Sequence, residues 1–208
     1  MEYRIGVDFD NTLISYDKLI HAIALERGLI RPDTHKNKKT IRDAIRQLPD
    51  GEAEWQRLQA ILYGPRMEEA TLARGVRAFF DLGKRRQARV YIISHKTEYA
   101  AYGEIRTNLR VAALDWMQRH DFFKADGLRI SPQDVFFTST RPEKIARIKQ
   151  LRCTHFIDDL EETFIEDSFP TGVERILYIP LATDLPSGGV RSFSTWKDIS
   201  QYVFGTKR

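Results

Sequence analysis

The stretch RIGVDFDNTLISYD, residues 4–17, places two aspartates, Asp8 and Asp10, at the end of an apolar segment. The segment that leads into them, YRIGVDF (residues 3–9), is rich in isoleucine, valine and aromatic residues, a composition typical of a buried strand. Carboxylates placed so close together repel each other unless another group compensates their charge. The rest of the chain therefore has to show whether the pair carries chemistry or only ends the strand.

Four further segments have the same strand-like composition, and helical patterns lie between them. The predicted strands are residues 3–9, 88–95, 134–139, 154–159 and 174–180. Apolar residues at helical spacing cover residues 75–86, 108–122 and 142–151. Strands that alternate with helices predict a parallel sheet covered on both faces, which is a three-layer α/β fold.

One connection is much longer than the others. Residues 16–72 lie between the first strand and the helix before the second strand, where ~2–6 residues are usual. Three amphipathic patterns occupy this stretch: YDKLIHAIALERG (16–28), KKTIRDAIRQL (38–48) and EAEWQRLQAILYG (52–64). We therefore predict a helical insertion over residues 16–72 and a core formed by residues 1–15 and 73–208.

Composition narrows the class of protein. The 208 residues are 42% hydrophobic, which is enough for a sizeable core. No apolar run approaches the ~20 residues that cross a bilayer, and charged residues interrupt the first ten positions, so we expect a cytoplasmic protein without a membrane partner. The single cysteine, Cys153, excludes an internal disulfide framework. The net charge of +4 is spread along the chain, which favours solvated basic clusters (35–39 and 84–86) over nucleic-acid binding without excluding it.

Polar side chains gather where the predicted strands end or where a helix opens beside them. The candidate site residues are Asp8, Asp10, Asn11, Thr12, Ser94, His95, Lys144, Asp158 and Asp159. Because the carboxyl ends of parallel strands meet at one edge of a sheet, we expect these side chains to lie close together. Mg²⁺ prefers oxygen ligands and would offset the repulsion between the carboxylates. The sequence therefore predicts a magnesium site made by Asp8, Asp10, Asp158 and Asp159, with phosphate contacts from Asn11, Thr12, Ser94, His95 and Lys144.

This set of groups suits phosphoryl transfer. One carboxylate can attack phosphorus and form an aspartyl-phosphate, which divides a slow hydrolysis into two easier steps. A second carboxylate two residues further on can protonate the leaving oxygen and then take a proton from the attacking water. A metal ion, the lysine and the Ser94 hydroxyl would stabilise the charge on the phosphoryl oxygens.

The same residues carry a resemblance to a known family. The segments DFDNTL (8–13), IISHKT (92–97), Lys144 and FIDDL (156–160) resemble, in this order, the four motifs of the haloacid dehalogenase-like (HAD) hydrolase superfamily, including its uncharacterised bacterial members. The resemblance implies a Rossmann-like core with strand order 3-2-1-4-5 and an all-helical cap inserted after the first strand.

With an aspartate at position 10, the chain resembles the phosphatase branch of the superfamily. The resemblance also implies roles for single residues. These implied roles are a nucleophile at Asp8, a general acid and base at Asp10, phosphate contacts at Ser94 and Lys144, and a Mg²⁺ ligand at Asp158.

Several assignments stay open. The aspartates at 8 and 10, and those at 158 and 159, can also cap a turn or a helix. Arg141 is an alternative to Lys144 as the phosphate-contacting cation, and His95 either contacts substrate or packs at the strand end.

We expect a Mg²⁺-dependent phosphatase that acts on a small phosphorylated molecule. One alternative is a phosphatase for nucleotides or polynucleotide ends, and another is a non-catalytic binding module that keeps the fold. The sequence indicates neither the substrate nor an oligomeric state.

Overall fold

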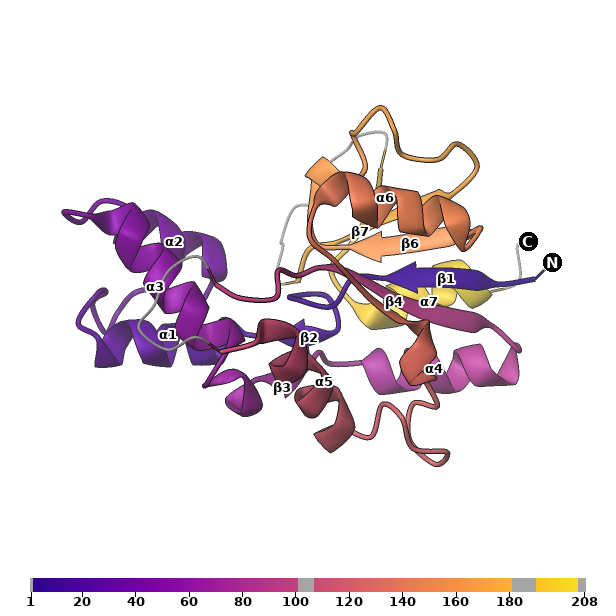
Figure 1. Ribbon diagram of the computed structural model, residues 1–208, viewed down its shortest axis with the longest axis horizontal. Helices are drawn as coiled ribbons and strands as arrows, with labels where there is room; N and C mark the ends of the chain where they lie inside the picture. Colours follow the sequence, from indigo (N-terminus) through magenta and orange to yellow (C-terminus); the bar gives the residue numbers. More distant parts are fainter. Residues whose placement is uncertain (1, 101–106, 181–189, 206–208) are drawn as a thin grey trace. The chain divides into compact units, whose positions relative to one another are not determined.

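The computed structural model describes residues 2–100, 107–180 and 190–205 (Figure 1). The chain forms two compact units. The first, which we call the core unit, consists of Met1–Leu13, Leu72–Lys96 and His120–Arg208, and the second, the helical unit, consists of Ile14–Thr71 and Thr97–Arg119. The candidate site residues all lie in the core unit, so its sheet determines their positions.

The core unit is built on a parallel sheet. Its strands are β1 (Arg4–Val7), β4 (Arg89–His95), β5 (Val135–Thr138), β6 (His155–Asp158), β7 (Glu174–Tyr178) and β8 (Arg191–Phe193). They are ordered β5-β4-β1-β6-β7-β8, and each neighbouring pair is parallel. The expected order 3-2-1-4-5 is confirmed. The edge strand β8 was not expected, because three residues are too few to show a strand pattern.

Helices cover both faces of this sheet (Figure 1). The longer helices of the core unit are α4 (Val76–Arg85), α6 (Arg141–Gln150) and α7 (Trp196–Phe204), and the short turns are η2 (Pro132–Asp134) and η3 (Glu161–Thr163). Alternate residues of a strand point to opposite faces, and in β7 Leu177 belongs to the cluster with α6 whereas the Tyr178 ring contacts Trp196 of α7 in a tilted arrangement. Helix α4 packs beside α7, where Phe79 contacts Trp196 with ring centroids 4.9 Å apart. The three-layer α/β architecture is therefore confirmed.

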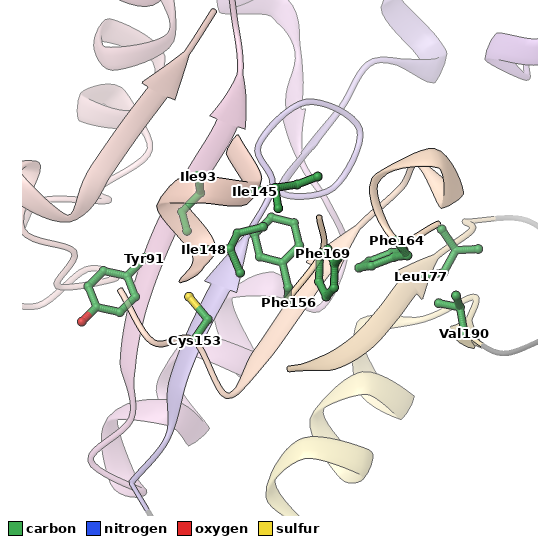
Figure 2. Close-up of a cluster of buried hydrophobic side chains, with 10 residues drawn as sticks. All are labelled: Tyr91, Ile93, Ile145, Ile148, Cys153, Phe156, Phe164, Phe169, Leu177 and Val190. Carbon is green, nitrogen blue, oxygen red and sulfur yellow. The ribbon is translucent and has the colours of Figure 1, made fainter. Parts of the chain in front are cut away.

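A buried cluster joins α6 to the sheet (Figure 2). Its members are Tyr91, Ile93, Ile145, Ile148, Cys153, Phe156, Phe164, Phe169, Leu177 and Val190. The neighbouring strand β1 offers a glycine to this face, since a Cβ on Gly6 would lie 2.6 Å from the Phe156 ring and 3.2 Å from the Cys153 sulfur. The Phe156 ring thus fills the space that a side chain on β1 would occupy.

We expect Gly6→Ala to destabilise the protein by ~1–3 kcal/mol, because the added methyl group overlaps a ring that is held by close packing. Equilibrium urea unfolding measures this change. Gly83→Ala is the matched control, because a Cβ there meets its nearest neighbours at 3.5 and 3.8 Å in helix α4, where alanine is favoured over glycine by up to ~1 kcal/mol. Equal stability of the two variants would contradict the close approach at Gly6.

The helical unit has a small core of its own. It contains α1 (Asp17–Glu26), α2 (Lys38–Ile45), α3 (Gly51–Tyr63), η1 (Met67–Glu69) and α5 (Leu109–Arg119). The first three helices match the patterns expected between residues 16 and 72. Strands β2 (Ile14–Ser15) and β3 (Thr71–Leu72) pair in a separate two-stranded sheet, with α1, α2 and α3 between them in the chain.

Helix α5 belongs to the helical unit, although the expected core range of 73–208 included it. The buried Trp116 indole donates a hydrogen bond to the Ala70 carbonyl over 3.0 Å, and Arg119 forms an ion pair with Glu68 at 2.6 Å. These contacts attach α5 to η1, which no local sequence pattern could reveal. Within the described residues, no helix has the length and apolar character needed to cross a membrane.

Candidate functional site

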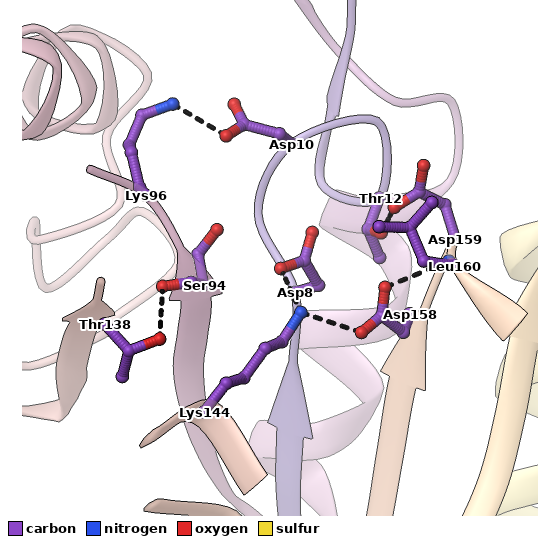
Figure 3. A network of polar contacts seen from close by, with 10 residues as sticks. All are labelled: Asp8, Asp10, Thr12, Ser94, Lys96, Thr138, Lys144, Asp158, Asp159 and Leu160. Carbon is purple, nitrogen blue, oxygen red and sulfur yellow. Dashed lines mark hydrogen bonds and ion pairs between the residues drawn. The ribbon is translucent and has the colours of Figure 1, made fainter. Parts of the chain in front are cut away.

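The carboxyl ends of β1 and β6 bring Asp8 and Asp158 together (Figure 3). Asp8 directly follows β1, and its backbone N–H donates to the Ile157 carbonyl over 2.8 Å, so the sheet pairing continues through it. Asp158 is the last residue of β6. Both side chains are buried, with 5% of Asp8 and none of Asp158 exposed to solvent.

Lys144 binds both carboxylates. Its Nζ donates to Asp8 Oδ1 and to Asp158 Oδ2, each over 2.7 Å, and only 2% of the residue is exposed. Helix α6 presents Lys144 one turn after its N-terminus, where the Thr140 hydroxyl accepts a hydrogen bond from the Glu143 N–H and caps the helix. Arg141, the alternative cation, instead pairs with Glu166 at 3.0 Å. Of the two candidate cations, the structure therefore places Lys144 among the aspartates.

Burial governs the charges in this cluster. It raises the pKa of Asp8, and the nearby negative charges of Asp158 and Asp10 raise it further, whereas Lys144 opposes the shift. Burial lowers the pKa of Lys144, but the charges of Asp158 and Asp8 outweigh this effect, so its pKa is raised overall. Lys144 therefore stays protonated beside two buried carboxylates, and one ammonium cannot balance them both.

A third carboxylate completes a group that fits a metal ion. Asp8, Asp158 and Asp159 each offer a carboxylate oxygen, and these three atoms lie within 4.8 Å of one another. Asp159 also accepts a hydrogen bond from the Thr12 hydroxyl over 3.4 Å, and the Leu160 N–H donates to Asp158 over 3.0 Å. An all-oxygen donor set with excess negative charge suits a hard divalent cation such as Mg²⁺.

Asp10, the fourth expected metal ligand, is not part of the three-carboxylate group that fits a metal ion among the described residues. Its carboxylate is instead bound by Lys96, whose Nζ lies 2.6 Å from Asp10 Oδ2. Sequence reasoning gave Lys96 no role, although it stands within the IISHKT segment just after strand β4. The sequence shows only that Lys96 is a charged residue directly after a buried strand. That position did not indicate its pairing with Asp10, 86 residues away.

The expected phosphate contacts fall into two groups. Ser94 is buried, with 1% exposed, and its carbonyl accepts a hydrogen bond from the Thr138 hydroxyl; Figure 3 shows it between Lys96 and Asp8. Thr12 is fully buried, and Asn11 adopts a left-handed backbone conformation (φ 59°) that turns the chain after Asp10. His95 points elsewhere, since its exposed ring lies 2.9 Å from the Ser139 carbonyl.

Mg²⁺ should stabilise the folded chain, because it would bind the carboxylate group only when the strand ends are assembled. At a concentration of 100 times Kd the expected gain is about 2.7 kcal/mol in the free energy of unfolding. We expect Asp159→Asn to lose most of this gain. Asp159 is partly exposed, and the variant should therefore still fold.

Thermal or urea unfolding with Mg²⁺ and with EDTA measures the effect. Glu161→Gln is the matched control, because it removes a negative charge from an exposed residue two positions away. If Mg²⁺ stabilises Asp159→Asn as much as it stabilises wild type, Asp159 is not a metal ligand.

The fold of this chain was compared with those of known proteins. No family model matches the sequence, and no curated protein matches it. Solved structures do match. A HAD-superfamily hydrolase from Ehrlichia chaffeensis is 18% identical, with a TM-score of 0.54 over 97% of this chain and 97% of that chain.

Two further structures agree with this one. A HAD-family hydrolase from Deinococcus radiodurans, solved with bound phosphate and sodium, is 14% identical, with a TM-score of 0.58 over 97% of this chain and 95% of that chain. A HAD-superfamily hydrolase of subfamily IA, variant 1, from Geobacter sulfurreducens is also 14% identical, with a TM-score of 0.58 over 97% and 96% of the two chains. At these identities the likeness shows the fold, and the resemblance seen in the sequence motifs is confirmed at that level.

Proposed function

We propose that this chain is a Mg²⁺-dependent phosphomonoesterase that acts on a small phosphorylated molecule through an aspartyl-phosphate at Asp8. The observation that carries the proposal is the buried group of Asp8, Lys144 and Asp158 at the carboxyl edge of a parallel sheet. Ligands bind at this edge in open α/β sheets. The similar structure from Deinococcus radiodurans, which holds phosphate and sodium, supports the same ligand chemistry.

In the first step an Asp8 carboxylate oxygen attacks phosphorus, and the bond from phosphorus to the leaving oxygen breaks. Asp10 gives its proton to that oxygen, so that the alcohol leaves neutral. The Lys144 ammonium, whose Nζ lies 2.7 Å from Asp8 Oδ1, and the buried Ser94 hydroxyl would donate hydrogen bonds to the phosphoryl oxygens.

In the second step water attacks phosphorus of the aspartyl-phosphate. The Asp10 carboxylate takes a proton from this water, the bond from phosphorus to Asp8 breaks, and inorganic phosphate is released. Asp8, Asp158 and Asp159 would hold the Mg²⁺ ion, which adds positive charge next to the phosphoryl oxygens when it is bound. After both steps Asp8 is again an ionised carboxylate and Asp10 again carries a proton, as at the start.

The helical unit would serve as the cap that selects the substrate. Its sequence position supports this role, since its first segment begins at Ile14, four residues after Asp10, and it has a buried core of its own that includes Leu58 and Trp116. Residues of the helical unit would then contact the leaving group, whereas residues of the core unit perform the chemistry. The alternative substrates, nucleotides and polynucleotide ends, stay a prediction of the sequence.

Phosphate release tests the proposal. Purified protein is assayed with para-nitrophenyl phosphate and with a panel of sugar phosphates and nucleotides, in Mg²⁺ and in EDTA. We expect release that requires Mg²⁺. If the chain binds Mg²⁺ and inorganic phosphate but turns over no member of the panel, the result contradicts the phosphatase and favours the non-catalytic binding module.

A further inference from the structure

Two lysines bind three of the four aspartates of the site (Figure 3). Lys144 binds Asp8 and Asp158, and both carboxylates belong to the group that fits a metal ion. Lys96 binds Asp10, which lies outside that group. The residue proposed for proton transfer is thus held separately from those proposed for attack and for metal binding.

The backbone of Lys96 is held by the sheet. Strands β4 and β5 pair in register up to His95 and Thr138, and the Lys96 N–H continues the pairing by donating to the Thr138 carbonyl over 2.9 Å. The side chain therefore starts from a rigid position at the end of the sheet.

The ammonium group of Lys96 is also confined. Only 3% of its side chain is exposed, and its Nζ lies 5.8 Å from the centre of the Phe9 ring. Phe9 is fully buried and stands between Asp8 and Asp10 in the sequence. A lysine buried in this way loses its hydration, and the ion pair with Asp10 compensates for part of that loss. Asp10 keeps 17% of its side chain exposed, so a leaving group or a water molecule can reach it from solvent.

We infer that Lys96 is a positioning residue, which holds the Asp10 carboxyl group in place for proton transfer and away from the metal-binding carboxylates. The inference rests on the proposed function, because it assigns to Asp10 the protonation of the leaving oxygen. Without Lys96, the partly exposed Asp10 side chain would lose the ion pair in which its Oδ2 lies 2.6 Å from the Lys96 Nζ. Proton transfer requires hydrogen-bond distance in a defined direction, so a less constrained Asp10 would transfer its proton more slowly.

Leaving groups of different basicity test the inference. Phenyl phosphate and 2,4-dinitrophenyl phosphate share the phosphate group and the aromatic ring, but only the phenolate of the first needs a proton to leave readily. We expect Lys96→Met to lower kcat/KM for phenyl phosphate about tenfold more than for the dinitrophenyl ester, which is part of the ~10²–10⁴-fold contribution of a general acid. The ratio of the two kcat/KM values is independent of how much of each preparation is folded.

Three further variants complete the experiment. Asp10→Asn should shift the same ratio at least as far, and Lys96→Met added to Asp10→Asn should shift it no further, because Lys96 acts through Asp10. Lys96→Arg restores the positive charge and should recover part of the ratio. Lys84→Met, at a partly exposed lysine that pairs with Asp81 on α4, is the control that should leave the ratio unchanged.

The outcomes separate the alternatives. A lysine that only stabilises the fold, or one that binds the phosphate shared by both substrates, would lower both kcat/KM values equally, and an unchanged ratio therefore overturns the inference. If Lys96→Met yields too little active protein, Lys96→Arg is used in its place. A kcat/KM ratio between those of wild type and Asp10→Asn supports the inference, and a ratio equal to that of wild type overturns it. Wild-type protein that hydrolyses neither ester would contradict the proposed function itself, which is a different result.

Discussion

Asp8→Asn should abolish phosphate release and leave the chain folded. An amide does not attack phosphorus, so no aspartyl-phosphate would form, and we expect turnover to fall by at least about 10³-fold. The fold should survive because Lys144 keeps its ion pair with Asp158 at 2.7 Å. Activity loss with retained structure distinguishes a chemical role from a structural one.

Two measurements check this prediction. Phosphate release is compared with Asp81→Asn, an isosteric change at a partly exposed aspartate that pairs with Lys84 on helix α4. Intact-mass spectrometry after acid quenching should detect a phosphoryl group on wild-type protein during turnover and none on the variant. Full turnover by Asp8→Asn would show that another residue is the nucleophile.

Lys144→Met should destabilise the protein by ~3–5 kcal/mol, the range measured when one partner of a buried ion pair is removed. The variant leaves Asp8 and Asp158, which are 5% and 0% exposed, without the cation that both share. Neither carboxylate can gain full hydration without opening the end of the sheet. The methionine also replaces the donor that the mechanism assigns to the phosphoryl oxygens, so activity should be lost as well.

Urea unfolding compares this variant with Lys149→Met, the same substitution at an exposed lysine of the same helix, for which we expect a change within ~0.5 kcal/mol. Mg²⁺ should recover more stability in Lys144→Met than in wild type, because the variant has one positive charge fewer among the three carboxylates. Equal stability of the two methionine variants would mean that the buried aspartates do not depend on Lys144.

Local patterns in the sequence were sufficient for much of the fold. The predicted strand at residues 3–9 appears as β1 (Arg4–Val7), and the one at 88–95 appears as β4 (Arg89–His95). Such strands are buried on both faces, and their continuous apolar runs reveal them. The order of the strands came from the resemblance of four short motifs to a known family, since periodicity alone does not specify neighbours.

Elements without a strong local pattern were missed. Strand β8 has three residues, and helix α7 (Trp196–Phe204) was not predicted, although Thr195 accepts a hydrogen bond from the Asp198 N–H in a cap that its Thr-x-x-Asp sequence suggests. Helix α5 was predicted, but its packing against η1 was not, because the contact of Trp116 with Ala70 joins residues 46 positions apart.

The sequence by itself determined that acidic side chains stand at the ends of apolar strands and that these strands alternate with helices. Those properties depend on neighbouring residues, and a strand end is visible in its own composition. Only the tertiary structure decided which cation serves which carboxylate. Lys144 and Asp8 are 136 residues apart, and Lys96 and Asp10 are 86 apart. Their pairing follows from the register of β1, β4 and β6 and from the burial of that sheet edge, and neither of these is a property of any short segment.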